Sequence, residues 1–343
     1  MEQNSLISFA DVKANLFDPE VLTLLKPSVY NPTPERLKRR AEKYSADKNT
    51  FVYACKKCGL YAGIVVLKTE NGTAEILDIA VKQKYHKKGL GKSLIDFILN
   101  QFPVDTITAE TDNAAVEFYK RCGFAVTPTG EVGSTSRYFC KMSAVSNHYD
   151  LLVEENNDPV HDPEPLREYM DKWDGQKFID SLQLTKEKSV LEIGVGTGRL
   201  AVRVAPECCD FFGIDISPKT AKRAKENLKK QTNVTLVCGD FMSYEFGRKF
   251  DVIYSSLTFM HIRDKRAAIS KVKSLLNIGG RFVLSIDKNQ SDTIDYGTRK
   301  IKIYPDNKED IVKYITRSEM NLMKVFETDF AFVFIAEMKQ NNS

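Results

Sequence analysis

The chain has 343 residues, of which 42% are hydrophobic and 28% are charged. One hydrophobic core rarely fills so long a chain, so the length indicates two domains of ordinary size. The formal net charge of +4, with acids and bases mixed along the chain, does not favour obligate nucleic-acid binding. No segment approaches the roughly 20 apolar residues that cross a bilayer, and the first residues lack a secretory leader pattern. We therefore expect a cytoplasmic protein with no membrane partner.

Seven cysteines lie along the chain, an odd number in a sequence too long to need disulfides, so we expect reduced thiols. Cys55 and Cys58 have a metal-like spacing, but no second pair or nearby histidine supplies the remaining ligands. They lie between two apolar runs, which favours a hairpin turn over a zinc site. We predict no metal centre.

Three strands are predicted between Phe51 and Val81, because apolar runs alternate there with two turn signals, KKCG and the dipeptide Asn71-Gly72. A glycine-containing loop over 83–91 then leads into an apolar helix. A strand over 104–110, a helix over 113–121 and a final strand over 137–142 follow. The first half is therefore predicted to have an α+β fold.

The composition changes between Ser143 and about Pro165, where the chain becomes acidic and contains prolines without sustained periodicity. From Leu166 onward, helices alternate with short apolar strands, which is typical of a mainly parallel α/β sheet. The predicted organisation is a domain over 1–143, a linker and lid over 144–165, and a domain of different fold over 166–343.

A glycine-rich turn, Glu192-Ile-Gly194-Val-Gly196-Thr-Gly198, follows the apolar strand SVLEI and precedes a helix. Glycines in this context let the backbone approach a ligand closely. The spacing does not satisfy the dinucleotide fingerprint, so NAD is disfavoured. The segment resembles the class I methyltransferases, whose E/DxGxGxG loop wraps the amino-acid part of S-adenosylmethionine (SAM). This resemblance spans about 149–339 and implies a doubly wound Rossmann-like fold.

The resemblance also implies roles for two acids that end successive strands. Asp215 falls where the family holds the cofactor ribose, and Asp240 falls where it contacts the adenine amino group. Asp215 has an alternative role as a helix cap, because Ser217-Pro218 follow it. The predicted SAM-binding residues are Tyr149, Glu192, Gly194, Gly196, Gly198, Asp215, Ile216, Asp240, Phe241 and Ser255.

The region after the fourth strand, over 250–262, lacks the Asn/Asp-Pro-Pro-aromatic and Pro-Cys motifs of base-modifying and glutamine-modifying relatives. It resembles the small-molecule branch of the family. His261 could deprotonate a nucleophile near neutral pH, or could be a capping or packing residue. Tyr149, Tyr169 and Trp173 are candidates to close over the sulfonium by cation–π contact, or else belong to the core.

The loop over 83–91 lies between a strand and a helix, so its amides would point at an anion over a helix N-terminus. Gly89 and Gly91 permit close approach and neighbouring lysines add charge, which suits the diphosphate of coenzyme A. Together with the N…A…FY…GF pattern over 113–124, the loop resembles the GNAT acetyltransferases over about 9–142. His86 stands where that family usually has Gln or Arg.

This second resemblance implies acetyl-CoA as a cofactor, with the strand around 78–81 pairing with the pantetheine arm. Tyr119 is in register with a tyrosine that often protonates the departing thiolate, and a packed aromatic role stays open. The base stays undecided between Glu75, Asp78 and Glu110; strand alternation places Asp78 on one face with Ile76 and Ala80. The predicted acetyl-CoA contacts are Ile79, Val81, Lys88, Gly89, Leu90, Gly91, Lys92 and Asn113.

The sequence thus predicts a bifunctional transferase, an N-acetyltransferase joined to a SAM-dependent methyltransferase, that acts on a small amine-containing metabolite. In one alternative, the first half is a catalytically idle acyl-CoA sensor that regulates the methyltransferase. In another, the protein modifies proteins or RNA, although the weak net charge and the missing base-modifying motifs count against this. The acceptor and the oligomeric state are not indicated.

Overall fold

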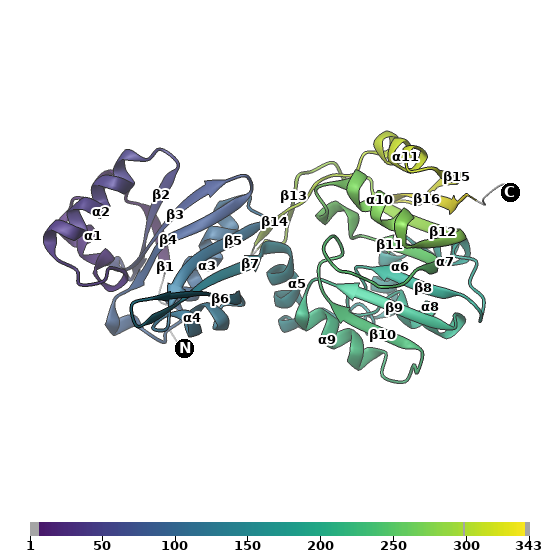
Figure 1. Ribbon diagram of the computed structural model, residues 1–343, viewed down its shortest axis with the longest axis horizontal. Coiled ribbons are helices and arrows are strands. Elements are labelled where there is room, and N and C mark those ends of the chain that lie inside the picture. The colour runs from purple at the N-terminus through teal and green to yellow at the C-terminus, as the bar shows by residue number, and fades with distance from the viewer. Residues whose placement is uncertain (1–6, 298, 340–343) are drawn as a thin grey trace. The chain divides into compact units, whose positions relative to one another are not determined.

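The computed structural model describes residues 7–297 and 299–339. The chain divides into two compact units, the first comprising Met1–Ala144 with Asp295–Ile301 and the second Val145–Ile294 with Lys302–Ser343. Each unit contains its own seven-stranded sheet (Figure 1). Among the described residues, no helix is long and apolar enough to cross a bilayer.

The sheet of the first unit has the order β1-β2-β3-β4-β5-β7-β6. All neighbouring strands are antiparallel except β4 and β5, which are parallel. The strands are β1 Ile7–Asp11, β2 Thr50–Lys57, β3 Leu60–Glu70, β4 Thr73–Val81, β5 Thr106–Asp112, β6 Ala125–Val132 and β7 Thr135–Ser143. The helices are α1 Pro19–Leu22, α2 Pro34–Ala46, α3 Leu90–Gln101 and α4 Val116–Arg121. This mixed α+β fold confirms the fold class predicted for the first half.

Two tight hairpin turns connect β2, β3 and β4, as predicted. Cys58 and Gly59 have φ angles of 51° and 79°, and Asn71 and Gly72 have φ angles of 50° and 80°. Two consecutive residues with positive φ are the requirement of the hairpin turn that matches the twist of paired strands. Cys58 therefore belongs to a turn, and among the described residues no cluster of three potential metal ligands occurs.

A β-bulge in β4 changes which side chains share a face of the sheet. Ile76 and Asp78 face consecutive residues of β3, so Leu77 is the extra residue of the bulge. Ile76 consequently packs in the core on the α3 side, whereas Ala80 packs in the core on the α1 and α2 side. The prediction that Asp78, Ile76 and Ala80 share one face is therefore wrong for Ile76, because the bulge reverses the alternation.

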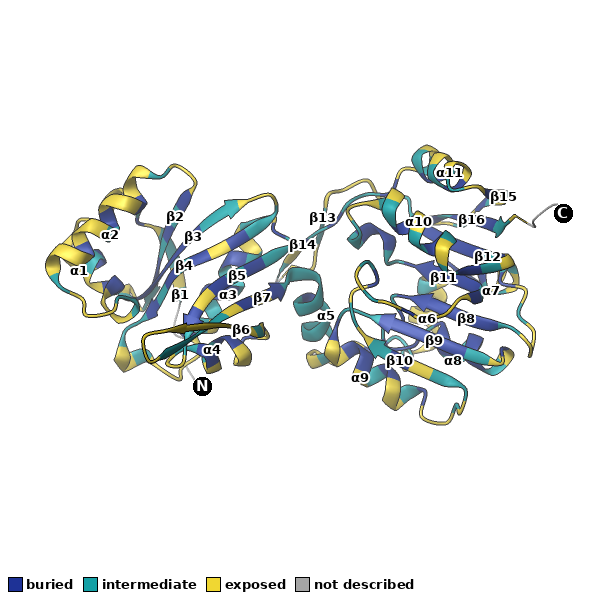
Figure 2. Ribbon diagram, viewed as in Figure 1, coloured by how far each residue is buried: buried dark blue, intermediate teal, exposed yellow. Residues whose placement is uncertain are grey.

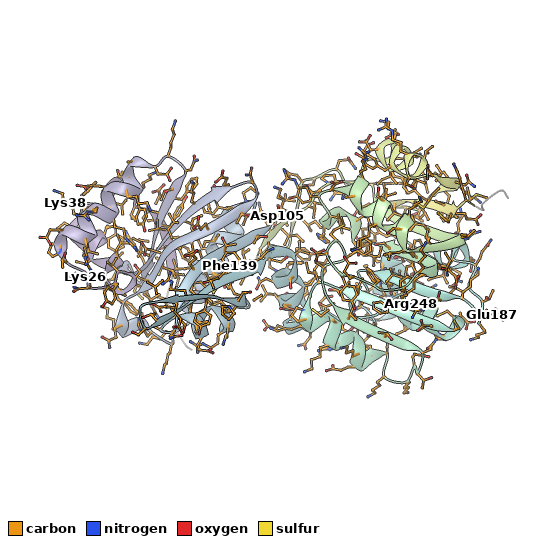
Figure 3. The ribbon with its side chains drawn as sticks, viewed as in Figure 1. Lys26, Lys38, Asp105, Phe139, Glu187 and Arg248 are labelled. Carbon is orange, nitrogen blue, oxygen red and sulfur yellow. The ribbon has the colours of Figure 1, made fainter. Side chains whose placement is uncertain are left out.

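Helices cover both faces of the first sheet, with α3 and α4 over one core and α1 and α2 over the other. Buried residues gather in the strands and exposed residues on the outer helix surfaces (Figure 2). Charged side chains such as Lys26 and Lys38 in the first unit, and Glu187 and Arg248 in the second, are exposed (Figure 3). At one edge of the sheet, β6 is almost entirely exposed and its pairing with β7 shifts register between Pro128 and Gly130.

The sheet of the second unit has the order β10-β9-β8-β11-β12-β16-β15. The first five of these strands are parallel, and β16 is antiparallel to both of its neighbours. The strands are β8 Ser189–Ile193, β9 Asp210–Asp215, β10 Val234–Cys238, β11 Phe250–Ser256, β12 Leu276–Asp287, β15 Met320–Glu327 and β16 Ala331–Met338. The short strands β13 Thr293–Asp295 and β14 Lys300–Lys302 form a separate pair.

Helices cover both faces of this sheet too, since α7, α8 and α9 contribute to one core and α10 and α11 to the other. This is the doubly wound fold predicted for the second half. The helices are α5 Ala144–Glu154, α6 Glu164–Met170, α7 Gly175–Ser181, α8 Ala201–Val204, α9 Pro218–Asn227, α10 Lys265–Leu275 and α11 Lys308–Arg317. The strand order reverses between β8 and β11, and open α/β sheets bind ligands at the carboxyl ends of the strands beside such a reversal.

The segment over 144–165 differs from the irregular linker that the sequence suggested, because 144–154 forms helix α5. Asp150 accepts hydrogen bonds from Ser217 Oγ at 2.6 Å and from the Lys219 amide at 3.0 Å, which fixes α5 to the start of α9. Asp158 is buried and contacts Arg223 and Asn227 of α9. The acidic residues that made the segment look like a linker thus bind α9.

We expect a fragment over 144–343 to be more stable than one over 166–343. The shorter fragment loses the contacts of Asp150 and Asp158, and three or four hydrogen bonds at about 1 kcal/mol each give a loss of about 3 kcal/mol. Urea unfolding of both fragments measures the difference. Equal stability would mean that 144–165 is a dispensable linker.

Candidate functional site

The glycine turn lies at the carboxyl end of β8. Gly194, Gly196 and Gly198 have φ angles of 78°, 58° and 101°, which side chains rarely tolerate. A Cβ on Gly194 would also lie 2.0 Å from Thr258 Oγ1, in the loop after β11. The turn therefore needs glycine both for its conformation and for its packing.

Asp215 lies at the end of β9 and joins this strand to the glycine turn. Its Oδ2 accepts a hydrogen bond from the Gly196 amide at 2.9 Å, and its Oδ1 accepts one from the Ser217 amide at 2.9 Å. Burial raises the pKa of the carboxyl, and the charge of Asp150 adds to the rise. Each oxygen keeps lone-pair capacity for a further donor.

Ser217, rather than Asp215, caps helix α9. The Ser217 hydroxyl accepts from the Thr220 amide at 3.1 Å and caps α9. Asp215 thus holds the glycine turn rather than capping the helix.

Two predicted contact residues lie beneath the turn. Glu192 is buried and accepts a hydrogen bond from the Tyr254 hydroxyl at 2.8 Å, and burial raises its pKa well above the usual range. Ser255 is buried and donates to the Ile193 carbonyl at 2.9 Å. The side chains of both residues connect β8 to β11.

A buried ion pair that sequence reasoning missed anchors the segment after the turn. Arg199 Nη1 donates to Asp174 Oδ1 at 2.9 Å, and its Nη2 pairs with the other carboxylate oxygen. Ser256, at the end of β11, donates to Asp174 at 2.7 Å, and so does the Gly175 amide at 2.8 Å. The position of Arg199 directly after Gly198 was the one available signal. Nothing in the sequence pointed to Asp174.

The remaining predicted contacts lie after β9 and β10. Asp240 is exposed, and its Oδ1 accepts from the Met242 amide at 2.9 Å. Phe241 is buried beneath the ammonium of Lys271, which lies 5.5 Å from the ring centroid. The Ile216 carbonyl accepts from Ser146 Oγ of α5 at 3.1 Å. The structure thus gathers the glycine turn, Asp215 and Asp240 along the carboxyl ends of β8, β9 and β10.

His261 follows β11, and its Nε2 lies 2.8 Å from the hydroxyl of Tyr149 on α5. Burial lowers its pKa to about 3, helped by His148 and Lys265. Within the described residues, its buried Nδ1 has no hydrogen-bond partner. The imidazole is therefore neutral at physiological pH and is a weaker proton acceptor than an ordinary histidine. The capping role is taken by Asp264, which accepts from the Ala267 amide.

We expect acidification to destabilise the second unit through His261. Its pKa of about 3 in the folded chain lies below the ordinary 6.5, so the unfolded chain binds a proton that the folded chain excludes. The contribution of His261 to the free energy of unfolding is complete above pH 6.5. It falls by about 1.4 kcal/mol per pH unit as the pH is lowered toward 3. Between pH 7 and 5, urea unfolding should show the wild type losing about 2 kcal/mol more than His261→Gln. The same loss in both proteins would contradict this assignment.

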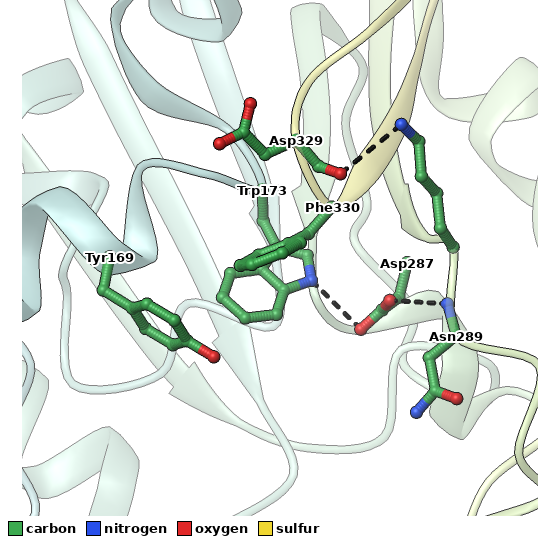
Figure 4. Close-up of a pocket in the computed structure, with 7 residues that line it drawn as sticks. Tyr169, Trp173, Asp287, Asn289, Asp329 and Phe330 are labelled. Atoms are coloured by element: carbon green, nitrogen blue, oxygen red, sulfur yellow. Dashed lines mark hydrogen bonds between the residues drawn. The ribbon is translucent and has the colours of Figure 1, made fainter.

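Three aromatic residues line a cavity of about 360 Å³ (Figure 4). Tyr169 and Trp173 precede β8, and Phe330 precedes β16. Ring centroids lie 5.4 Å apart for Tyr169 and Trp173, and 4.7 Å apart for Trp173 and Phe330. Tyr149, which the sequence grouped with Tyr169 and Trp173, instead contacts His261. Phe330 was missed, because a single phenylalanine in a turn gives no sequence signal.

In the first unit, a loop connects β4 to α3. Gly89 has a φ angle of 81° and caps the 12-residue helix α3, which begins at Leu90. A Cβ on Gly91 would lie 2.6 Å from the Phe118 ring, so this glycine allows α3 and α4 to pack closely. Lys88 is exposed, and Lys92 pairs with Asp96 at 2.8 Å. His86 Nε2 lies 2.8 Å from the Val81 carbonyl oxygen, so this side chain contacts the end of β4.

Strands β4 and β5 pair only along their first part. Their register runs from Thr73 opposite Thr106 to Ile76 opposite Ala109 and stops at the bulge. Beyond it, among the described residues, β4 has a strand partner only on the β3 side. The stretch that contains Ile79 and Val81 is therefore open toward β5.

The predicted catalytic residues of this half lie in different environments. Asp78 is buried and bound by Arg40 and by the Tyr44 hydroxyl of α2, and burial raises its pKa. Tyr119 is buried, and burial raises its pKa as well. Glu110 is exposed, 3.8 Å from Arg137.

Two more predicted site residues of this half are Glu75 and Asn113. Glu75 is exposed on β4. Asn113 accepts from the Tyr138 hydroxyl at 2.9 Å. Of the three candidate bases, Asp78 alone is buried and Glu75 and Glu110 face solvent.

Residues 190–280 match a family described as a methyltransferase domain, and residues 25–144 match one described as an acetyltransferase (GNAT) domain. An uncharacterized methyltransferase of Bacillus thuringiensis (strain Al Hakam) is 40% identical over 113 residues, which are 32% of this chain and 52% of the relative. One of Bacillus cereus (strain 03BB102) is 39% identical over the same length and the same shares. The chain spans about half the length of these curated relatives.

Two solved structures are similar to about half of this chain. A putative S-adenosylmethionine dependent methyltransferase from Listeria monocytogenes is 15% identical with a TM-score of 0.43, covering 48% of this chain and 96% of that one. The N-methyltransferase NodS from Bradyrhizobium japonicum WM9, in complex with S-adenosyl-L-homocysteine, is 18% identical with a TM-score of 0.41, covering 52% and 94%.

Proposed function

We propose that this chain, which contains a methyltransferase domain and a GNAT acetyltransferase domain, is a bifunctional transferase that methylates and acetylates a small amine-containing metabolite. SAM is the proposed methyl donor and acetyl-CoA the proposed acetyl donor. The observation that supports the proposal most directly is the position of Asp215, which lies at the carboxyl end of β9 and accepts a hydrogen bond from the Gly196 amide.

Support for SAM comes from the carboxyl edge of the second sheet. The glycine turn lies beside the point where the strand order reverses, and Asp215 offers acceptors for two ribose hydroxyls. Bound SAM would supply an activated methyl group. The chain's own part is then to align the acceptor with that methyl, and alignment alone can supply a large share of a rate.

Support for acetyl-CoA comes from the loop before α3 and from the opening between β4 and β5. The N-terminus of α3 and the exposed Lys88 beside it suit a diphosphate, and the open side of β4 offers hydrogen bonds to an extended amide-containing arm. Tyr119 lies in α4, where its phenol is the proposed proton donor to the leaving thiolate.

The idle-sensor alternative also has an observation in its favour. Asp78, the one buried acid among the candidate bases, is already bound by Arg40 and Tyr44, and the other two, Glu75 and Glu110, are exposed. Incubation of a cell extract with both cofactors, followed by mass spectrometry, separates the two functions. One compound that gains an acetyl and a methyl group supports the bifunctional enzyme, and methyl gain alone supports the sensor.

Replacement of Asp215 tests the SAM site. Charge-assisted hydrogen bonds contribute roughly 1.5–3 kcal/mol each, so Asp215→Ala and Asp215→Asn should both weaken SAM at least ~10-fold in titration calorimetry. Acetyl-CoA affinity should stay the same, because that site belongs to the other domain. Normal SAM affinity in both variants would overturn the assignment.

The control for Asp215 is a true helix cap in the same unit. The Asn307 side chain accepts from the Asp310 amide at 3.0 Å and caps α11. Asn307→Ala should lower stability by about 0.5–2 kcal/mol and leave SAM affinity unchanged.

Tyr119→Phe tests the acetyl-transfer step. The phenyl ring keeps the packing against Phe118 and Phe124 but removes the proton donor. Acetyl turnover should fall ~100-fold while acetyl-CoA affinity changes little. Unchanged turnover with an accepted amine would assign the proton to water or to another group.

A further inference from the structure

The aromatic cavity of the second unit, formed by Tyr169, Trp173 and Phe330, also contains acidic groups. Asp287 ends β12 on one wall, and Asp329 lies beside Phe330 (Figure 4). Asp287 is fixed, since its Oδ2 accepts from Trp173 Nε1 at 3.0 Å and its Oδ1 from the Asn289 amide at 2.7 Å. Neither donor carries a charge, so the carboxylate stays available to a cation.

Lys288, the one basic residue of the lining, lies 3.2 Å from Glu327 Oε2 and donates to the carbonyls of Thr328 at 2.8 Å and of Asp329 at 3.5 Å. Its charge is thus paired with Glu327. Outside the lining, the ammonium of Lys172 lies 5.2 Å from the Phe330 centroid and 5.6 Å from that of Tyr169. A cation of the chain itself thus already makes cation–π contacts with two of the three rings, Phe330 and Tyr169.

The cavity and the glycine turn lie along the same edge of the sheet. β12, which ends at Asp287, is the neighbour of β11, and β11 is the neighbour of β8. Trp173 is followed directly by Asp174, whose carboxylate pairs with Arg199 next to the turn. A molecule in the cavity would therefore be held by residues that are rigidly connected to the proposed SAM site.

We propose that this cavity binds a positively charged ammonium group of the methyl acceptor as a recognition group; an ammonium nitrogen has no lone pair, so the atom that takes the methyl is another nucleophile of the same molecule. Aromatic faces and a fixed carboxylate together favour an organic cation over a neutral or anionic molecule of the same shape. A volume of about 360 Å³ is large enough for a small metabolite. This inference rests on the proposed methyltransferase function and narrows its acceptor to a cationic amine.

Trp173 makes the test direct, because it is the chain's single tryptophan and lines the cavity. Choline and its neutral isostere 3,3-dimethyl-1-butanol are titrated into the full chain, with and without SAM, while tryptophan emission and heat are recorded. Choline should give a saturable change, and the isostere should bind at least ~10-fold more weakly. Equal binding of both probes, or no saturable signal in either measurement, would overturn the proposal.

Variants then locate the binding site. Asp287→Asn keeps an acceptor for the indole but removes the charge, and Phe330→Ala removes one ring, so each should weaken choline by ~10-fold or more. Tyr30→Ala, at a ring that is 91% exposed in the first unit, is the matched control and should change nothing. Unweakened choline binding in both cavity variants would place the cation elsewhere and refute the proposal.

SAM affinity, measured in the same samples, separates this inference from the function on which it rests. Normal SAM binding by Asp287→Asn and Phe330→Ala shows that the variants are folded. SAM binding without choline selectivity would refute the cation site alone. Absence of SAM binding in the wild type would refute the proposed methyltransferase function, and with it the acceptor role of the cavity.

Discussion

The second unit depends on one buried ion pair, between Asp174 and Arg199. The Asp174 side chain is fully buried and that of Arg199 nearly so, and removal of either partner would leave an unpaired charge in the core, at a cost of about 3–5 kcal/mol. The pair joins three elements that are distant in the sequence: the start of α7, the segment after the glycine turn and, through Ser256, the end of β11. The ion pair thereby makes the glycine turn rigid at the proposed ligand site. It also fixes Asp174, which directly follows Trp173 of the aromatic cavity.

Local patterns predicted the parts of the fold in which local chemistry decides the conformation. The hairpin turns at Cys58-Gly59 and Asn71-Gly72 require positive φ, and few residues other than glycine and asparagine adopt it readily. The glycine turn was recognisable for the same reason, and the parallel strands of the second unit, covered on both faces, appear as short apolar runs. Asp215 could be placed because a strand end and a following helix start fix its position to within a residue.

Features that arise from pairing between distant segments could not be predicted. The bulge at Leu77 follows from the register between β3 and β4, which the sequence of β4 alone does not contain. Helix α5 was not predicted, because the contacts of Asp150 with α9 stabilise it and it has no sustained apolar repeat. The neutral state of His261 likewise depends on burial beside Tyr149, and residue chemistry alone suggested a histidine that titrates near neutral pH.

The exposed strand β6 has a consequence for how the first sheet meets other chains. An edge strand normally presents a row of free amides and carbonyls, which is a template for adding a strand from another molecule. In β6 this row is interrupted, because Pro128 has no amide hydrogen and the register shifts before Gly130. Intermolecular strand addition at this edge is therefore discouraged by the backbone itself, without any need for a covering helix.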